Sequence, residues 1–362
     1  MFDVKEFQDF ELFRRVSELL SYRSEVQDLD PIVAQLHEMF FMAECVASAR
    51  IEGNHTTITD YLLRDRTLED TDLHKQITNI LSAIRFVQDT ADVRLDAGYI
   101  RELHRQVTEG LQEEGDRNPG CFRSAEVRIQ GADVCPPSVG DVPDRIHQLV
   151  QEINAPCEPL VYLLKTLWAH HAFTVIHPFE NGNGRTARLL TYAMLARAGL
   201  TTVNGWALHP SVIFSYDREA YYHHLNLADK GDISAWMRYM ADGLVQNIRG
   251  LVSLGTQQEV ARKNLAPLLR KLAPGDCAPI LVLALCTPGG IRPADVKKIL
   301  PDWSEFTVSR RLRSLRDAGW LKRDINNKRL HHLQLLGCKP LLRAMMEFFN
   351  RKGLLLDDQV MR

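Results

Sequence analysis

The chain has 362 residues, of which 45% are hydrophobic, and a formal net charge of -2 at pH 7. This length and hydrophobic content allow two or three domains with buried cores, and they exclude a chain that is mainly disordered. The small net charge excludes a whole-protein bias toward nucleic acid or membrane surfaces, so any basic surface must be local.

Cysteine spacing and apolar run length indicate the compartment. The cysteines, at positions 45, 121, 135, 157, 277, 286 and 338, are scattered and include no Cys-x-x-Cys pair. This pattern fits neither a zinc knuckle nor a disulfide framework, so a reducing cytoplasmic environment is expected. No signal peptide and no apolar run long enough to cross a bilayer is seen.

Apolar residues recur at helical spacing through most of the chain, for example over 32–47 and 160–168, so a mainly α fold is expected. The first exception is residues 126–130, where alternation predicts a short strand or hairpin. The second is a polar loop, 177–184, which separates a helix that ends near Val175 from a helix over 185–200.

The chain beyond Pro267 and the cluster 273–276 reads as a small separate unit. Its predicted elements are helices over 279–285, 293–300 and 307–318, a hairpin over 320–335 that turns at Asn326-Asn327, and a helix over 340–350. Three helices and a hairpin in this order are typical of a winged helix-turn-helix domain.

The polar loop carries the strongest chemical pattern. Gly182, Asn183 and Gly184 precede a helix, and glycine amides at a helix N-terminus form a ready anion site. Arg185 and Arg188 share a helical face and can both reach a di- or triphosphate. His177 lies at the other end of the loop and is the nearby side chain suited to accept a proton. An anion site beside a base indicates group transfer to a hydroxyl.

These residues, His177-Pro-Phe179 followed by Gly182-Asn-Gly-Arg185 and Arg188, resemble the signature loop of the Fic family. The resemblance implies a Fic-type helical core with a small hairpin flap. It also implies a protein adenylyltransferase that transfers AMP from ATP to a Ser, Thr or Tyr hydroxyl, with Mg2+ held against the phosphates. His177 would be the base, the loop the phosphate cradle, and the arginines the clamps on the outer phosphates, while Phe179 packs beneath the loop.

Asn181 departs from the family pattern, because it stands where an Asp or Glu normally binds the metal. An amide oxygen can ligate Mg2+ but brings no charge. Weaker metal binding at Asn181, another nucleotide, or low activity therefore all stay open.

A second match concerns regulation. Ser48, Glu52 and Gly53 resemble the inhibitory helix motif of many Fic proteins, in which the Glu pairs with the second loop arginine. Glu52 would then pair with Arg188 and occupy the space of the γ-phosphate. A carboxylate and a phosphate compete for one guanidinium, so ATP would bind weakly or misaligned.

Two further segments resemble parts of the family's site. Val127, Arg128 and Ile129 match the flap, which holds an extended target segment by strand addition. Tyr222 and Asp229 match the segment that lines the adenine pocket, although Asp229 replaces the more usual Asn.

Basic residues cluster in the C-terminal unit and predict DNA binding there, with protein contacts as the alternative. The proposed DNA-contacting residues are Arg310, Arg311, Arg313, Lys328 and Arg329.

The predicted domain order is a helical region with the inhibitory helix over 1–95, a Fic catalytic core over 96–265, a winged helix over 266–338, and a helix and tail over 339–362. The partner would be a target protein or the chain itself, with DNA at the winged helix and no membrane; a homodimer is left open. The alternative function is a nucleotide-sensing DNA-binding regulator with a weak or inactive loop. A Fic enzyme that transfers another nucleotide or phosphate is a further alternative.

Overall fold

The protein is described by a computed structural model. The described residues are 2, 9–22, 31–63, 71–129, 131–132, 134–203, 206–253, 261–287 and 289–351. The expected tail after residue 351 lies outside them.

Helices dominate the first two thirds of the chain, as the apolar spacing predicted. They are α1 (Phe10–Ser21), α2 (Pro31–Ile51), α3 (Ile58–Leu63), α4 (Asp72–Asp89), α5 (Ala97–Thr108), a 3-10 turn (Val139–Asp141), α6 (Val142–Asn154), α7 (Pro159–Ile176), α8 (Asn183–Arg197), α9 (Pro210–Tyr216), α10 (Arg218–Asp229) and α11 (Ile233–Ser253). A short antiparallel pair, β1 (Thr202–Val203) and β2 (Trp206–Ala207), lies between α8 and α9.

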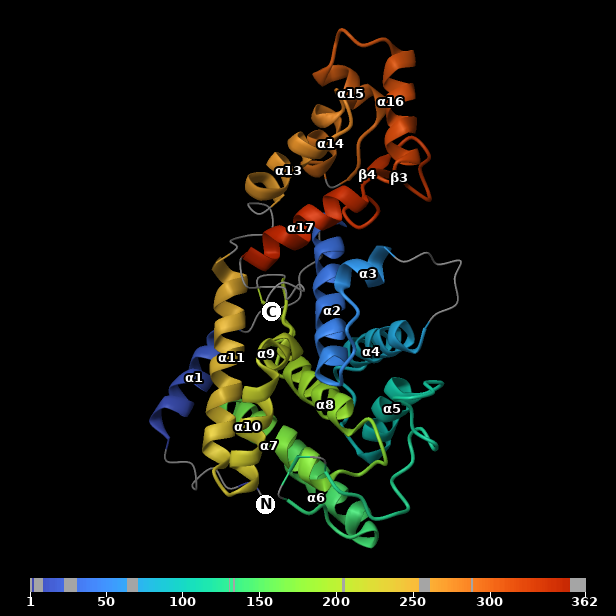
Figure 1. The fold of residues 1–362 in the computed structure, drawn as a ribbon. Coiled ribbons are helices and arrows are strands. Elements are labelled where there is room, and N and C mark those ends of the chain that lie inside the picture. The colour runs from blue at the N-terminus through green and yellow to red at the C-terminus, as the bar shows by residue number, and fades with distance from the viewer. Residues whose placement is uncertain are drawn as a thin grey trace.

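The remaining elements form the C-terminal part of the chain. A π-helical turn (Ala261–Leu265) leads into α13 (Ala266–Leu272), followed by α14 (Ala278–Leu285), α15 (Pro293–Ile299), α16 (Glu305–Asp317), β3 (Leu321–Arg323), β4 (His331–Leu333) and α17 (Lys339–Arg351). β3 and β4 are antiparallel with Leu321 opposite Leu333, and Ile291 forms an isolated bridge to His331. Figure 1 shows these elements at one end of the molecule, with α17 between them and the helical body.

Helix α8 lies at the centre of the helical body and contacts α7, α4 and α5. Every residue from Arg185 to Leu195 is buried. An all-round apolar environment favours Leu, Ala and Met at most of these positions, but it also encloses Arg185 and Arg188, whose charges need partners there. The helix ends before Gly199, whose φ of 73° is a left-handed stop, so the helix expected over 185–200 is shorter at its C-terminal end.

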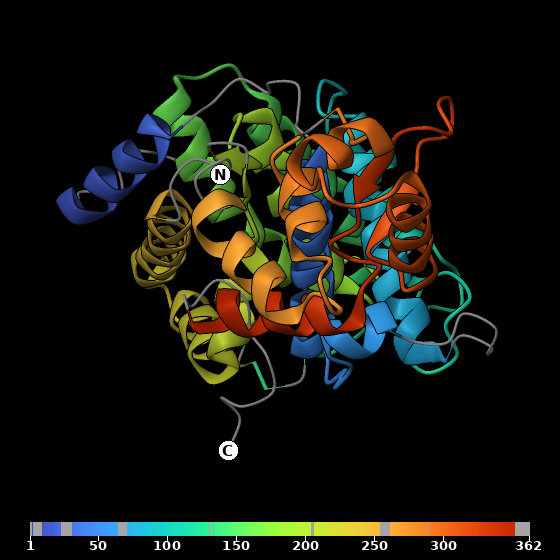
Figure 2. The ribbon, with the colours of Figure 1, turned by 90° about the horizontal axis from the view of Figure 1, so that it is seen from above.

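Helix α2 links the C-terminal part to the centre. It packs against α4, α8 and α9, and its Phe40 ring lies 5.2 Å from the Phe349 ring of α17. Seen from above, α17 crosses over α2 (Figure 2). The side chain of Gln35 donates to the Leu333 carbonyl at 2.9 Å and accepts from the Leu335 amide at 2.7 Å. One helix therefore contacts both the C-terminal hairpin and the helices around α8.

The strand expected at residues 126–130 is not formed in the described part of that segment. Val127 and Ile129 are half-buried and Arg128 is exposed, so the predicted alternation of faces is present. Ladder bonds are missing because the neighbouring chain bonds elsewhere: the Val139 amide donates to the Glu126 side chain at 3.0 Å instead of to a backbone carbonyl. The predicted hairpin flap is an extended loop.

None of the helices in the described residues is both apolar and long enough to span a bilayer.

Candidate nucleotide-transfer site

The loop between α7 and α8 turns through two left-handed residues. His177 has φ 48° and ψ 59° and is the one non-glycine residue with positive φ in the described residues. Gly182 has φ 72°, and a Cβ there would lie 2.5 Å from the Thr108 side chain, so only glycine fits. Backbone strain at a non-glycine residue is often found at functional sites. The turn directs His177 and the first turn of α8 to the same end of the helix pair.

The ring of His177 is held in one tautomer. Its Nδ1 lies 3.2 Å from the Thr174 carbonyl oxygen, which can only accept, so Nδ1 carries the proton and Nε2 keeps its lone pair. Burial lowers the pKa of His177 below 6.5, and this outweighs the hydrogen bond that His177 donates to the Thr174 carbonyl, which raises the pKa. A neutral imidazole with an accepting Nε2 is the form that a general base needs at neutral pH.

The loop is closed from inside by Asn183 and Phe179. The Asn183 side chain accepts from the Phe179 amide at 3.0 Å and donates to the Phe179 carbonyl at 2.9 Å. Phe179 is buried, as expected, and stacks on His104 with ring centroids 3.6 Å apart. Because its side chain is used inside the loop, Asn183 would offer its backbone N–H, and not its side chain, to an anion.

Glu52 occupies the start of α8. An added Cβ at Gly184 would lie 2.6 Å from Glu52 Oε1 and 3.2 Å from Arg188 Nη1. The first amides of a helix lack intrahelical acceptors and carry partial positive charge, so a carboxylate there is stabilised. The side chain of Glu52 therefore lies in the space that the glycine loop leaves for an anion.

Arg188 makes the contacts that the inhibitory-helix resemblance implied. Its Nη2 donates to Glu52 Oε1 at 2.6 Å and to the Ser48 carbonyl at 3.0 Å, and its Nε donates to Ser48 Oγ at 2.9 Å. Burial acts most strongly on the pKa of Glu52 and raises it, but the charges of Arg188 and Arg185 and the hydrogen bond from Arg188 together lower the pKa below its ordinary value. The predicted pairing of Glu52 with Arg188 is present.

Gly53 lies just after the end of α2. It has φ 92°, and its amide donates to the Arg50 carbonyl at 2.9 Å. The following Asn54 is buried and donates to the Leu73 carbonyl at 2.9 Å and to Gln76 at 2.6 Å. This turn fixes the position of Glu52 relative to α8.

Arg185 is turned toward the α5 end and the loop after it. Its guanidinium donates to the Val107 carbonyl at 3.2 Å and to the Glu114 carbonyl at 2.6 Å, and its side chain is 1% exposed. Burial lowers the pKa of Arg185 from its ordinary value, and the nearby carboxylates of Glu52 and Glu114 oppose that shift. Both loop arginines therefore bind protein acceptors in this structure, so a nucleotide must displace at least the Glu52 carboxylate to reach Arg188.

The side chain of Asn181 is bonded within the loop region. The side chain of Asn181 donates to the Gly115 carbonyl at 3.0 Å, and its oxygen accepts from the Gly182 amide at 2.7 Å. The closest carboxylate in contact, Asp116, accepts from the Asn181 amide at 3.2 Å and the Asn118 amide at 2.8 Å. No group of three or more His, Cys, Asp or Glu side chains suited to a metal occurs in the described residues. The expectation that Asn181 is a ligand is therefore not supported by its contacts.

Arg123 joins the flap segment to the catalytic loop, a role that the sequence reading missed. Its buried guanidinium donates to the His177 carbonyl at 2.9 Å, to the Ala125 carbonyl at 3.1 Å and to the Pro137 carbonyl. Its backbone amide donates to the Pro178 carbonyl at 2.8 Å. Arg123 therefore ties both sides of this segment to the backbone at His177 and Pro178.

His104 and Asp116 were also missed. His104 Nδ1 accepts from the Gly120 amide at 2.9 Å, so Nε2 carries the proton and donates to the Asn181 carbonyl at 3.0 Å. Burial lowers the pKa of His104 to about 4, which keeps the ring neutral. One weak signal in the sequence could have indicated a role for Asp116 and Arg123, because both are charged side chains inside a Gly- and Pro-rich segment.

Tyr222 and Asp229, expected at the adenine pocket, lie on α10. Tyr222 is 39% exposed, and the Arg218 guanidinium lies 5.4 Å from its ring centre. Asp229 is bonded to His171 at 2.8 Å, so its carboxylate already has a partner. The preceding Tyr221 is buried and its hydroxyl is bonded to His170 at 2.9 Å. Tyr221 therefore belongs to the core, whereas Tyr222 lies at the surface.

The basic residues of the C-terminal unit separate into two groups. Arg310, Arg313, Lys328 and Arg329 are exposed. Arg311 is instead paired with Asp276 at 2.9 Å and lies over the Trp303 ring, so its guanidinium already has partners within the unit.

Taken together, the geometry defines a helical domain with a histidine loop and an anion site that an internal carboxylate fills. Residues 94–195 match the model of the Fic/DOC family. Similar curated proteins are named protein adenylyltransferase Fic. The protein from Aedes aegypti is 28% identical, and the match covers 66% of this chain and 47% of the relative. The protein from Drosophila virilis is 34% identical, and the match covers 54% of this chain and 39% of the relative. The chain thus spans less than half the length of these relatives.

Solved structures show the same fold. A Fic family protein from Desulfovibrio desulfuricans G20 has 21% identity and a TM-score of 0.58, covering 92% of this chain and 98% of its own. Fic-1 from C. elegans has 23% identity and a TM-score of 0.53, and the match covers 67% of this chain and 71% of the Fic-1 chain. The first comparison extends across nearly the whole chain, beyond the residues of the family match.

Proposed function

We propose that this protein transfers AMP from ATP to a Ser, Thr or Tyr hydroxyl of a target protein, and that Glu52 restrains the reaction. The observation that carries the proposal is the Glu52 carboxylate, which is bound to Arg188 and lies against Gly184 at the start of α8. A site that accepts one anion in this position has the donors to accept a phosphate. The names of the curated relatives support adenylyl transfer as the chemistry.

In the proposed reaction, His177 Nε2 takes the proton from the target hydroxyl as its oxygen attacks the α-phosphorus of ATP. The bond from the α-phosphorus to the bridging oxygen breaks, and pyrophosphate leaves with that oxygen. The first turn of α8, with Arg188 freed from Glu52, stabilises the charge on the phosphates. Flap residues Val127 and Ile129 would hold the target segment, since their extended backbone carries no ladder bonds among the described residues.

The experiment compares the wild-type protein with Glu52→Gly in the presence of ATP and magnesium, with intact-mass spectrometry as the readout. Glu52→Gly should gain the mass of an adenylyl group on itself or on a protein of a lysate, and the wild type should gain little. Glu52→Gly combined with His177→Ala should gain none. Glu113→Gly, which removes an exposed carboxylate, is the matched control and should behave as wild type. ATP binding without an adduct on any protein would contradict transfer and favour a nucleotide-sensing regulator.

Magnesium is part of this proposal through the nucleotide. Since the Asn181 amide is bonded to Gly115 and Gly182, we propose that the ATP phosphates hold the ion and that the loop adds no carboxylate ligand.

A second candidate function is DNA binding by the C-terminal unit, proposed here as a winged helix over 266–338. The bridge between Ile291 and His331 adds a third short strand position to the β3-β4 hairpin, which is the sheet such a domain needs. Val308, Leu312 and Leu315 of α16 are buried, so the opposite face of the helix with Arg310 and Arg313 is open. Duplex affinity that falls steeply with salt, and falls again in Arg313→Gln, would support it. Binding that is absent at low salt removes this candidate.

The remaining proposals concern organisation and compartment. The proposed core over 96–265 contains almost all of the family match, and the helical region over 1–95 supplies Ser48 and Glu52 to it. All seven cysteines are free thiols, which supports the proposal of a reducing, cytoplasmic environment.

A further inference from the structure

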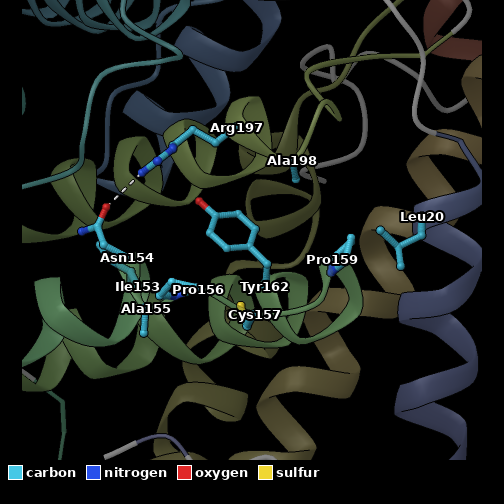
Figure 3. Close-up of a pocket in the computed structure, with 10 residues that line it drawn as sticks. All are labelled: Leu20, Ile153, Asn154, Ala155, Pro156, Cys157, Pro159, Tyr162, Arg197 and Ala198. Carbon is cyan, nitrogen blue, oxygen red and sulfur yellow. Dashed lines mark hydrogen bonds between the residues drawn. The ribbon is translucent and has the colours of Figure 1, made fainter.

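A small cavity lies away from the catalytic loop, where the end of α1, the connection between α6 and α7, and the end of α8 meet (Figure 3). Its volume is about 290 Å³, which is close to the lower end of the range for small-molecule sites. Its apolar wall includes Leu20, Ile153, Pro156 and Pro159, and polar atoms make up nearly half of the surface that faces it.

A buried phenol in the wall of this cavity lacks a partner. The hydroxyl of Tyr162 is shielded from solvent and has no hydrogen bond within the described part of the chain. Burial raises the pKa of Tyr162 to about 12, so the group remains an O–H donor at neutral pH. Buried hydroxyls in folded proteins are nearly always bonded, so this one indicates a ligand atom or a water in the cavity.

The second polar group of the cavity is a cation. Arg197 belongs to the last turn of α8, and its Nη1 donates to Asn154 Oδ1 at 3.1 Å. Figure 3 shows the Tyr162 hydroxyl directed toward the Arg197 side chain. None of the described residues that line the cavity is acidic. The guanidinium has five N–H donors, so the bond to Asn154 leaves others for a ligand.

We propose that this cavity binds a small organic carboxylate, with its carboxylate between Arg197 and the Tyr162 hydroxyl and its hydrocarbon part against the apolar walls. One cation and one neutral donor match a monoanion, and the apolar half of the lining, which includes Leu20, Ile153 and Pro159, favours a ligand with a hydrocarbon body over an inorganic ion.

This site is separate from the proposed nucleotide site. Helix α8 begins at Asn183 beside Glu52 and ends at Arg197, so its two ends are about 21 Å apart at the usual rise per residue. A ligand in the cavity therefore does not contact His177 or the phosphates. The binding proposal does not depend on adenylyl transfer, although the two sites share α8.

The test titrates the full-length protein with benzoate, benzamide and inorganic phosphate and follows binding by nuclear magnetic resonance. Benzoate and benzamide have nearly the same shape and differ in charge, whereas phosphate has charge without an apolar body. Benzoate should bind at least tenfold more tightly than either of the other two. Arg197→Gln should weaken benzoate at least tenfold and Tyr162→Phe several-fold, because the latter removes only the hydroxyl. Arg145→Gln, an exposed arginine on α6, should leave it unchanged.

Each other outcome overturns part of the proposal. Equal affinity for benzoate and benzamide would show that charge plays no role. Phosphate binding as tight as benzoate would identify a simple anion site. Benzoate affinity unchanged in a folded Arg197→Gln would place the ligand elsewhere, and no binding of benzoate at all would remove the site.

Discussion

A methyl group could not be added to Gly184 without moving the Glu52 carboxylate. The added Cβ would lie 2.6 Å from Glu52 Oε1. The missing Cβ at Gly184 therefore leaves room for the Glu52 carboxylate in this structure, and it would leave the same room for a phosphate. Arg188 is buried, and Glu52 supplies its counter-charge. The pairing therefore leaves no uncompensated guanidinium inside the protein.

This pairing predicts a trade between stability and nucleotide binding. In Glu52→Gln the Arg188 charge loses its counter-ion, so without nucleotide the free energy of unfolding should fall by about 2 kcal/mol. Saturating Mg-ATP should raise the melting temperature of the variant more than that of the wild type, because the phosphates replace the carboxylate. Thermal unfolding with and without nucleotide measures both effects. Equal nucleotide shifts in the two proteins would contradict competition between Glu52 and phosphate.

Arg123 should affect turnover more than nucleotide affinity. Arg123→Gln removes the bonds to the His177, Ala125 and Pro137 carbonyls, so the base and the flap lose their shared support. In a Glu52→Gly background we expect kcat/KM to fall about 100-fold, as expected when a reacting group is misplaced by about 1 Å, while the Kd for ATP changes less than about threefold.

The controls for Arg123 separate charge from geometry. Arg123→Lys keeps the charge but cannot make the three bonds in a plane, so it should not restore the rate. Arg117→Gln, an exposed arginine in the same segment, should leave the rate unchanged. Loss of ATP affinity equal to the loss of rate would point to general damage of the fold.

The pH dependence should report on His177. Burial holds the pKa of its imidazole below 6.5, so the neutral base predominates at pH 7 and is lost as the pH falls through that lowered pKa. The kcat/KM of Glu52→Gly should therefore be flat near neutral pH and decline only below about pH 6.5. The Glu52 carboxylate acts to raise the pKa of His177. Because Glu52→Gly lacks this carboxylate, the pKa of His177 should be lower in the variant than in the wild type. A limb centred above pH 7 would exclude His177 as the base.

The sequence predicted those parts of the site that follow from short-range patterns. Helical spacing located α7, α8 and α16, and Glu52 could be paired with Arg188 because both belong to motifs. The roles of Arg123 and Arg185 could not be predicted in this way. Their acceptors are backbone carbonyls, which are present at every position and leave no trace in the residue pattern.

The flap shows a second limit of sequence reasoning. Alternation of Val127, Arg128 and Ile129 correctly predicted which side chains face inward, but strand pairing depends on where a neighbouring chain places its carbonyls. Residue Val139 bonds to a side chain there, so no ladder forms with it.

Asn181→Asp tests the departure from the family pattern. The change places a carboxylate where the amide now lies and gives up its bond to the Gly115 carbonyl. In the Glu52→Gly background we expect labelling at limiting Mg2+ to rise about tenfold, because a carboxylate is a much better Mg2+ ligand than an amide. A titration with Mg2+ at fixed ATP measures this. An unchanged half-saturating Mg2+ concentration would show that residue 181 takes no part in metal binding.

Gln35 provides the test of whether the C-terminal hairpin supports the inhibitory helix. Its side chain makes two bonds to the backbone at Leu333 and Leu335, whose side chains are buried, and it lies on the same helix as Ser48. Gln35→Ala leaves a carbonyl and an amide without these partners, so the free energy of unfolding should fall by about 2 kcal/mol in denaturant titrations. Because α2 is then held less firmly, self-labelling with ATP should rise above wild type and stay below Glu52→Gly. Gln151→Ala, an exposed glutamine on α6, is the control. Lower stability with wild-type labelling would show that the hairpin holds α2 without influencing Glu52.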